Sequence, residues 1–399
     1  MRKFFKLANF LLFVLVFWGV IALGSYAPAR TILKQADLNP PRLDPAKLEN
    51  PEESYAALER AIFGKFTPPG LFELTSKETL ASDWLDGRAK VERRVYSVSH
   101  GQAPQLVEYV IVTPLKNPEA PLIISQNFSS DRSVISSGKT SPLGGKVSSM
   151  GPLDGVFRYF FGRYISRPPL EDILDKGYGF IAVHPPTYVA DRAKDGTAQL
   201  NAMFGDVKDR PGALTVWASL TTALADELKT ENPNRPIISY GHSRYGKTAL
   251  LAAAHSPSID AAIAHQSGTA GASLMRDNTG ESLGEILRAY PQWLTPMAAE
   301  YGDSPKRLPS DAHALLAVIS PKPIFLGNAR RDVWSDPEGA YQAARWAANN
   351  TTQTFSATRL DDFKPADDIA IWTRPGTHGV VKEDWPAFLA FLDAHFEVK

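Results

Sequence analysis

The stretch from Pro236 to Leu250 (PIISYGHSRYGKTAL) constrains the fold of this chain more than any other. A short apolar run, typical of a buried strand, breaks at Gly241, presents Ser243 and continues into an Ala/Leu-rich segment with helical spacing. Gly241 and Gly246 permit a tight turn where a side chain would clash, so Ser243 is expected at the head of a sheet, above a helix N-terminus. A glycine-bordered turn with an incidental serine fits the same pattern.

Strand-like and helix-like segments alternate on both sides of this turn. Such alternation predicts a mostly parallel sheet covered by helices on both faces, an α/β sandwich of three layers. Two earlier segments, 93–99 and 106–114, alternate apolar and polar residues like antiparallel strands. The other predicted strands are 121–128, 177–184, 236–240, 259–264, 323–328 and 368–374, and a helix is predicted over 212–229.

Composition excludes several classes of function. Forty-three basic and 43 acidic residues leave no net charge, which gives no reason to expect a nucleic-acid partner. The absence of cysteine excludes disulfides, thiolate catalysis and Cys-ligated zinc. A Gly-Lys-Thr run at 138–140 lacks the earlier glycine of a phosphate-binding loop, because position 133 is serine. No cofactor or metal is therefore predicted.

The N-terminus predicts export. Arg2, Lys3 and Lys6 precede an apolar run over 7–24, which is about long enough to span a bilayer. Residues 1–29 are expected to be either an uncleaved membrane anchor, with a transmembrane helix, or a signal peptide cleaved after the A-x-A sequence at 27–29. The globular part is expected to face the periplasm or to be secreted.

The remaining chain is interpreted as one catalytic unit with an appended N-terminal segment. Residues 30–90 are expected to form a linker and a cap segment, with helical spacing over 53–62, and residues 91–399 the sheet domain. Residues 184–211 are expected to be a polar loop after a strand. The segment 268–311 is too long for a simple connection and is predicted to be a lid or pocket wall.

Three residues occur in the order that acyl transfer by a serine requires. In α/β-hydrolases the acid follows the second strand after the serine's strand, and the histidine follows the last strand. Counting strands places Asp332 at the acid's position and His378, in a Gly-bordered loop, at the histidine's. Asp336 competes as the acid, although it precedes Pro337 as a helix N-cap would.

The stretch GHSRYGK at 241–247 resembles the signature of the glucuronoyl esterases, carbohydrate esterase family 15. The resemblance covers about 121–395, and the family shares the unusual spacing of Gly246 from Ser243. Its other matching segments, all in the family's order, are Asn127-Phe128, HQSGTAGA (265–272), GESL (280–283), PQW (291–293), ISPKPIF (319–325), DVWSDPEG (332–339) and RPGTHGVVKEDW (374–385).

The resemblance implies an α/β-hydrolase that hydrolyses esters of a uronic acid, such as the bond between 4-O-methyl-glucuronoyl groups of xylan and lignin alcohols. It places the catalytic serine, histidine and acid on Ser243, His378 and Asp332. It also gives Arg244 the role of holding the oxyanion, and Lys247 and Trp293 contacts with the sugar.

One position departs from the family and leaves alternatives open. Many members carry glutamate, which binds substrate or acts as the triad acid, where this chain has Gln266. We therefore expect Gln266 in the substrate site and the acid role on Asp332 or Asp336. The alternatives to uronic esters are acetyl, feruloyl or lactone substrates, or a membrane-tethered, non-catalytic binding protein. The partner expected is a small-molecule or oligosaccharide ester.

Overall fold

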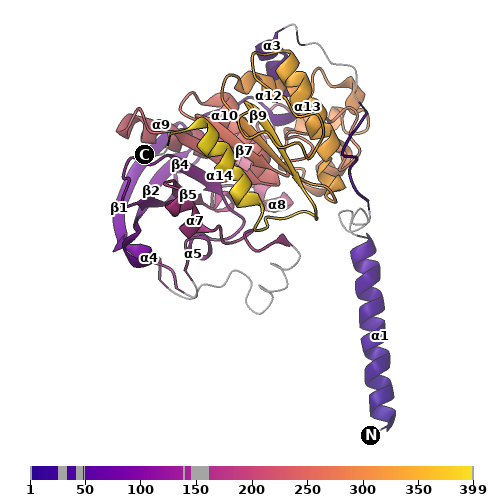
Figure 1. Cartoon of the computed structure of the whole chain (residues 1–399). Coiled ribbons are helices and arrows are strands. Elements are labelled where there is room, and N and C mark those ends of the chain that lie inside the picture. Colours follow the sequence, from indigo (N-terminus) through magenta and orange to yellow (C-terminus); the bar gives the residue numbers. More distant parts are fainter. Residues whose placement is uncertain are drawn as a thin grey trace.

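The computed structural model describes residues 2–25, 34–41, 48, 50–137, 140–144 and 161–397. Its first helix, α1 (Arg2–Ser25), stands apart from the globular body in Figure 1. Most of the large hydrophobic side chains described between Leu7 and Phe17 are exposed. Among the described residues, no helix is both long and apolar enough to cross a membrane, which does not support the transmembrane anchor predicted for residues 1–29.

The globular part is built on one nine-stranded sheet with the strand order β1-β2-β3-β5-β4-β6-β7-β8-β9. Strands β1, β2 and β3 pair antiparallel, β3 is antiparallel to β5, and every later pair is parallel. The predicted fold class and the two early antiparallel strands are confirmed. The strands are β1 (Leu71–Asp83), β2 (Ala89–Ser99), β3 (Gln105–Pro114), β4 (Leu122–Gln126), β5 (Gly179–Val183), β6 (Ile237–His242), β7 (Ala261–His265), β8 (Ile324–Ala329) and β9 (Ile369–Arg374).

Helices cover both faces of the sheet, and successive strand residues divide between the two cores. Ile237 packs in one core and Ile238 in the other, as the alternation of side chains along a strand requires. One face carries α3 (Pro51–Leu58), α9 (Ala213–Glu231), α10 (Arg244–His255), α12 (Ala312–Ile319) and α13 (Pro337–Asn349), and the other α5 (Asp131–Val134), α7 (Leu170–Asp175) and α14 (Asp384–His395) (Figure 1). The remaining helices and turns are π-helix η1 (Glu59–Phe63), α4 (Trp84–Gly87), η3 (Pro185–Thr187), α8 (Ala193–Phe204), α11 (Leu283–Ala289), η4 (Pro296–Glu300), η5 (Pro305–Arg307) and η6 (Val333–Ser335).

Two local interpretations of the sequence differ from the structure. Strand β1 lies in the segment predicted to be linker and cap, and the predicted boundary at residue 91 falls inside β2 of the same sheet. The segment expected to be a polar loop contains helix α8, of which only Gly196, Leu200 and Met203 are buried. The predicted cap helix at 53–62 is present as α3 followed by η1, and it packs in the core through Leu58 and Ile62.

Candidate active site

Ser243 occupies a sharp turn between β6 and α10. Its backbone has φ 56° and ψ −124°, a conformation that non-glycine residues rarely adopt and that persists at functional sites when the surroundings enforce it. A Cβ on Gly241 would lie 1.9 Å from the carbonyl oxygen of Tyr245, so the turn demands glycine there. A Cβ on Gly246 would meet its nearest neighbours at 3.1 Å, which is tight but not prohibitive.

The structure brings His378 and Asp332 together from two separate loops. Nδ1 of His378, in the loop after β9, donates to Oδ2 of Asp332, in the turn after β8, at 2.8 Å. Although burial alone would raise it, the facing His378 ring and the Ser335 hydroxyl hold the pKa of Asp332 below its ordinary value. A carboxylate at this site keeps the proton of His378 on Nδ1, which leaves Nε2 as the basic nitrogen.

Asp336, the competing acid, is engaged elsewhere. It is the N-cap of α13, with Oδ1 accepting from the backbone N–H of Gly339 at 3.1 Å and from the hydroxyl of Thr279 at 2.7 Å. The residue is buried, and burial raises its pKa. Its contacts are those of a helix cap, and none of them reaches His378.

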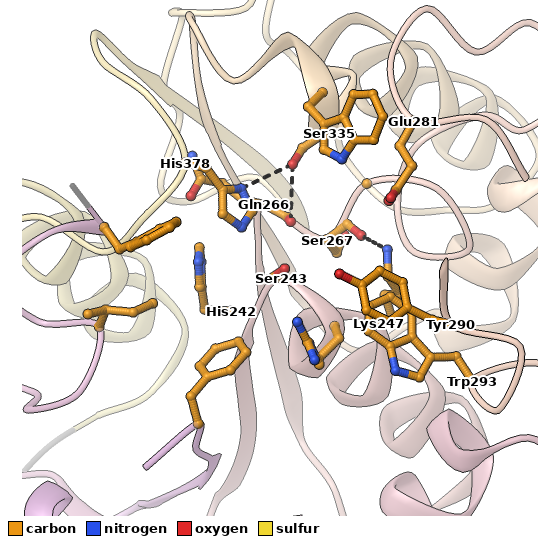
Figure 2. Close-up of a pocket in the computed structure, with 16 residues that line it drawn as sticks. His242, Ser243, Lys247, Gln266, Ser267, Glu281, Tyr290, Trp293, Ser335 and His378 are labelled. Carbon is orange, nitrogen blue, oxygen red and sulfur yellow. Dashed lines mark hydrogen bonds between the residues drawn. The ribbon is translucent and has the colours of Figure 1, made fainter. Parts of the chain in front are cut away.

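Gln266 holds the loop that carries His378. Its amide oxygen accepts from the backbone N–H of Gly379 at 2.8 Å, and its amide nitrogen donates to the carbonyl of Thr377 at 3.3 Å. In Figure 2 the Ser335 hydroxyl lies between His378 and Gln266, 3.4 Å from Nδ1 and 3.5 Å from the Gln266 carbonyl. Gln266 therefore supports the His378 loop and also lines the pocket, and its expected contact with substrate stays a prediction.

Ser243 and His378 open into one pocket of about 280 Å³. Figure 2 shows His242 on one side of Ser243, with Lys247, Tyr290 and Trp293 on the other. The segment 268–311, predicted to be a lid or pocket wall, supplies Gly268, Glu281, Tyr290 and Trp293 to the lining. The remaining lining residues are Phe128, Phe161, Ile165, His242, Arg244, Lys247, Gln266, Ser267, Trp334 and Ser335.

Arg244 is fixed by an acidic and aromatic cage. Its guanidinium is paired with Asp191 and lies over the ring of Trp293 at 4.7 Å, with Phe128 and Tyr290 at 5.3 and 5.4 Å. Trp293, which stacks on Tyr290 at 3.9 Å, donates its indole N–H to Asp191 at 2.7 Å. Trp293 thus helps to hold Arg244 in place and also lines the pocket, and its expected contact with sugar stays a prediction.

Lys247 is a buried cation at the floor of the pocket. Its ammonium donates to the carbonyls of Ser267 and Thr269, the latter at 2.6 Å, and an ammonium has a third N–H that these bonds do not use. Burial lowers the pKa of Lys247 to about 8. Burial also raises the pKa of Glu281, an effect that the charge of Lys247 partly offsets. Lys247 and Glu281 together give this side of the pocket a donor and an acceptor.

Sequence reasoning missed four residues of the site. Asp191 lies between η3 and α8, far in sequence from Arg244, and no local pattern marks it. Glu281 stands in the GESL segment but was assigned no role, and neither were Tyr290 and His242. Within the described ranges, no cluster of three or more histidine or acidic side chains is arranged to hold a metal ion.

Comparisons with known proteins find similarity to carbohydrate esterases. A family model described as "Glucuronyl esterase, fungi" matches residues 172–355. The chain is 30% identical over 244 residues to "Carbohydrate esterase MZ0003" from an unknown prokaryotic organism, covering 57% of this chain and 55% of that protein. It is 25% identical over 286 residues to 4-O-methyl-glucuronoyl methylesterase 1 of Wolfiporia cocos, covering 68% of each. The alignment thus spans about half the length of the first of these relatives.

Solved structures show the same fold. A glucuronoyl esterase from Solibacter usitatus matches with a TM-score of 0.72 at 24% identity, over 88% of this chain and 93% of that one. A structure described as "a promiscuous CE15 esterase from the marine bacterial metagenome" matches with a TM-score of 0.72 at 22% identity, over 92% and 99%.

Proposed function

We propose that this chain, a glucuronoyl esterase-like protein with an α/β-hydrolase fold, is a serine esterase that hydrolyses esters of uronic acids. The observation that carries the proposal is the arrangement around Ser243. A serine on a strained strand-to-helix turn shares one pocket with His378, whose Nδ1 is held 2.8 Å from a buried carboxylate. These are the parts that acyl transfer needs.

The chemistry begins with Ser243 as nucleophile. His378 Nε2 removes the serine proton as Oγ attacks the ester carbonyl, and Asp332 stabilises the imidazolium that forms. The Arg244 backbone N–H, at the start of α10, is the donor for the negative charge that develops on the carbonyl oxygen, and the Arg244 guanidinium, paired with Asp191, lines the same pocket. His378 then protonates the leaving alcohol, and water releases the acid from the acyl-enzyme.

The polarity of the pocket supports a uronic acyl group. Lys247 and Glu281 offer a donor and an acceptor to sugar hydroxyls on one side of Ser243. Phe128 and Ile165, which line both this pocket and a small cavity beside His242, give the other side an apolar lining suited to an alcohol. The names of relatives with 4-O-methyl-glucuronoyl methylesterase activity point to the same acyl group.

A broader carboxylesterase is the second candidate. Gln266, at the position where many relatives carry glutamate, has both amide atoms occupied by the His378 loop, so the pocket has one acidic contact fewer for a sugar. One structural relative is itself described as promiscuous. Acetyl, feruloyl or lactone esters are the substrates that this reading predicts.

A substrate panel tests both candidates. We expect benzyl glucuronate to be hydrolysed with a higher kcat/KM than benzyl acetate, methyl ferulate or a small lactone. Faster hydrolysis of the simple esters would favour the broader carboxylesterase. Ser243→Ala should abolish all activity with an unchanged melting temperature, whereas Ser304→Ala, at an exposed serine, should retain it. Wild-type rates in Ser243→Ala would exclude the mechanism.

We also propose that residues 1–29 direct export as a signal peptide. Three basic residues, an apolar run and the Ala27-Pro28-Ala29 sequence support this reading. Mass spectrometry of the exported protein should find a mature N-terminus at Arg30. Recovery of the full-length N-terminus from the exported fraction would contradict it.

A further inference from the structure

A buried chain of polar groups runs from the sheet to the pocket behind His378. Nδ1 of His242 lies 3.1 Å from Nδ1 of His265, and Nε2 of His265 lies 3.4 Å from Oδ1 of Asp384. Asp384 also accepts from Nε of Arg374 at 2.8 Å and from the backbone N–H of Val381 at 2.8 Å. None of these groups has a part in the acyl-transfer steps described above.

The series of polar groups from His242 through His265 to Asp384 determines which nitrogen of each imidazole ring carries the proton. Although burial opposes its charge, His265 and Arg374 lower the pKa of Asp384 to about 2, so it is an acceptor only. Burial holds the pKa of His242 well below its ordinary value and lowers that of His265, so both rings are neutral at pH 7. Oδ1 of Asp384 lies 3.4 Å from Nε2 of His265 without forming a well-aligned hydrogen bond, and its negative charge favours the tautomer with the proton on Nε2. In that tautomer Nδ1 of His265 accepts the proton that His242 bears on Nδ1.

The consequence is a bare nitrogen at the pocket. His242 is only 4% exposed and lines the pocket that holds Ser243, and its Nδ1 is directed at His265. No hydrogen bond joins its Nε2 to any residue that the structure describes. The ring centroids of His242 and His378 are 4.6 Å apart. A fixed hydrogen-bond acceptor therefore stands beside the proposed general base.

A second, water-sized cavity adjoins this acceptor. It has a volume of about 10 Å³, near the minimum that holds one water molecule. Its lining mixes polar residues, among them Asn127, Tyr164, Tyr240 and His242, with the apolar Phe128, Ile165, Pro168 and Val380. The polar side chains are of the kind that a buried water needs as partners. His242, which lines this cavity, lies on the side of Ser243 away from Lys247 (Figure 2).

We propose that His242 binds the water that hydrolyses the acyl-enzyme, accepting one of its two O–H groups at Nε2 while the other faces His378. The inference rests on the proposed esterase function. In the step itself, His378 Nε2 takes one proton of the water as the water oxygen bonds to the acyl carbon. The tetrahedral intermediate then breaks its bond to Ser243 Oγ, which regains the proton from His378. The second hydrogen remains on the oxygen and leaves with the carboxylic acid.

Methanol, used as a competing nucleophile, distinguishes a water-binding role of His242 from a role in packing alone. Methanol can also attack the acyl-enzyme, but it has a single O–H, which it gives to His378, so it loses nothing when the second acceptor is removed. Water loses a hydrogen bond. The ratio of methyl ester to acid formed in buffer with methanol therefore reports the contact directly, whichever step limits turnover.

The experiment compares wild type with His242→Phe and His242→Gln on benzyl glucuronate, or on 4-nitrophenyl acetate if only simple esters are cleaved. His242→Phe should raise the ratio of methanolysis to hydrolysis roughly five- to tenfold, the effect of one neutral hydrogen bond. His242→Gln, whose amide oxygen can accept, should stay near the wild-type ratio.

Other outcomes overturn the inference. An unchanged ratio in His242→Phe, or an equal rise in both variants, would show that the acceptor does not hold the water. A fall in kcat/KM with an unchanged ratio would leave His242 only a packing role against His378. Melting curves establish folding, and His242→Ala replaces the phenylalanine variant if that one unfolds. A wild-type protein that cleaves no ester would refute the proposed function, and this inference with it.

Discussion

Exchanging Asp332 for asparagine isolates the electrostatic part of the proposed mechanism. Asp332 Oδ2 accepts the Nδ1 proton of His378 at 2.8 Å, and asparagine has nearly the same shape. If the amide nitrogen faces the ring, His378 must carry its proton on Nε2 and can no longer accept one from Ser243. Asparagine also removes the negative charge that stabilises the imidazolium. A loss of about 10⁴ in kcat is expected, as for other triads, which is about 5.4 kcal/mol in activation free energy.

Asp336→Asn is the matched control, four residues away and equally buried. Asparagine is a good N-cap, so the bonds to Gly339 and Thr279 can persist, and we expect kcat within about threefold of wild type and a stability loss below about 1 kcal/mol. Asp336→Ala should lower stability by about 1–2 kcal/mol instead. Steady-state kinetics and thermal melting of the variants give both quantities. A larger loss of kcat in Asp336→Asn than in Asp332→Asn would refute the assignment of the acid.

Three further predictions follow from single contacts. Gly241→Ala should prevent the native turn, because its Cβ would lie 1.9 Å from a backbone oxygen. Gly246→Ala, whose Cβ would have its nearest contacts at 3.1 Å, should fold with a lower melting temperature. Equal melting curves for the two variants would contradict this. Burial lowers the pKa of Lys247 to about 8, so the side chain is charged below that pH and neutral above it. The wild-type kcat/KM should fall as pH rises through about 8, and Lys247→Met should lack this fall; its persistence would assign it to another group. Gln266→Ala should reduce kcat about tenfold with KM unchanged, because the His378 loop loses two hydrogen bonds. A change in KM alone would instead indicate that Gln266 contacts the substrate.

The sequence by itself determined the local architecture of the site. The turn at Ser243 could be predicted because its requirements are local: an apolar strand, a glycine where a Cβ would clash, and a helix directly after. The positions of Asp332 and His378 followed from counting strands, because parallel strands place their carboxyl ends at one edge of the sheet. The count favoured Asp332 as the acid but left Asp336 as a competitor, and the contact of Asp332 with His378 is seen only in the folded protein.

Elements with little buried surface escaped prediction. Strand β1 is an edge strand whose side chains are mostly exposed, so it lacks the alternation of apolar and polar residues that marks a half-buried strand. Helix α8 buries three residues and contains a glycine, which weakens its helical pattern. Strand β1 is held in the sheet by its backbone hydrogen bonds to β2, which the pattern of its side chains does not reveal.

Only the tertiary structure decided what the side chains around Ser243 do. Asp191 reaches Arg244 across 53 residues and Gln266 reaches the His378 loop across more than 100, so neither partner appears in a local pattern. The open nitrogen of His242 depends on His265 and Asp384, which share no motif with it. Local sequence fixes backbone conformation, whereas the proton on a ring and the place of a charge depend on neighbours that only folding brings into contact.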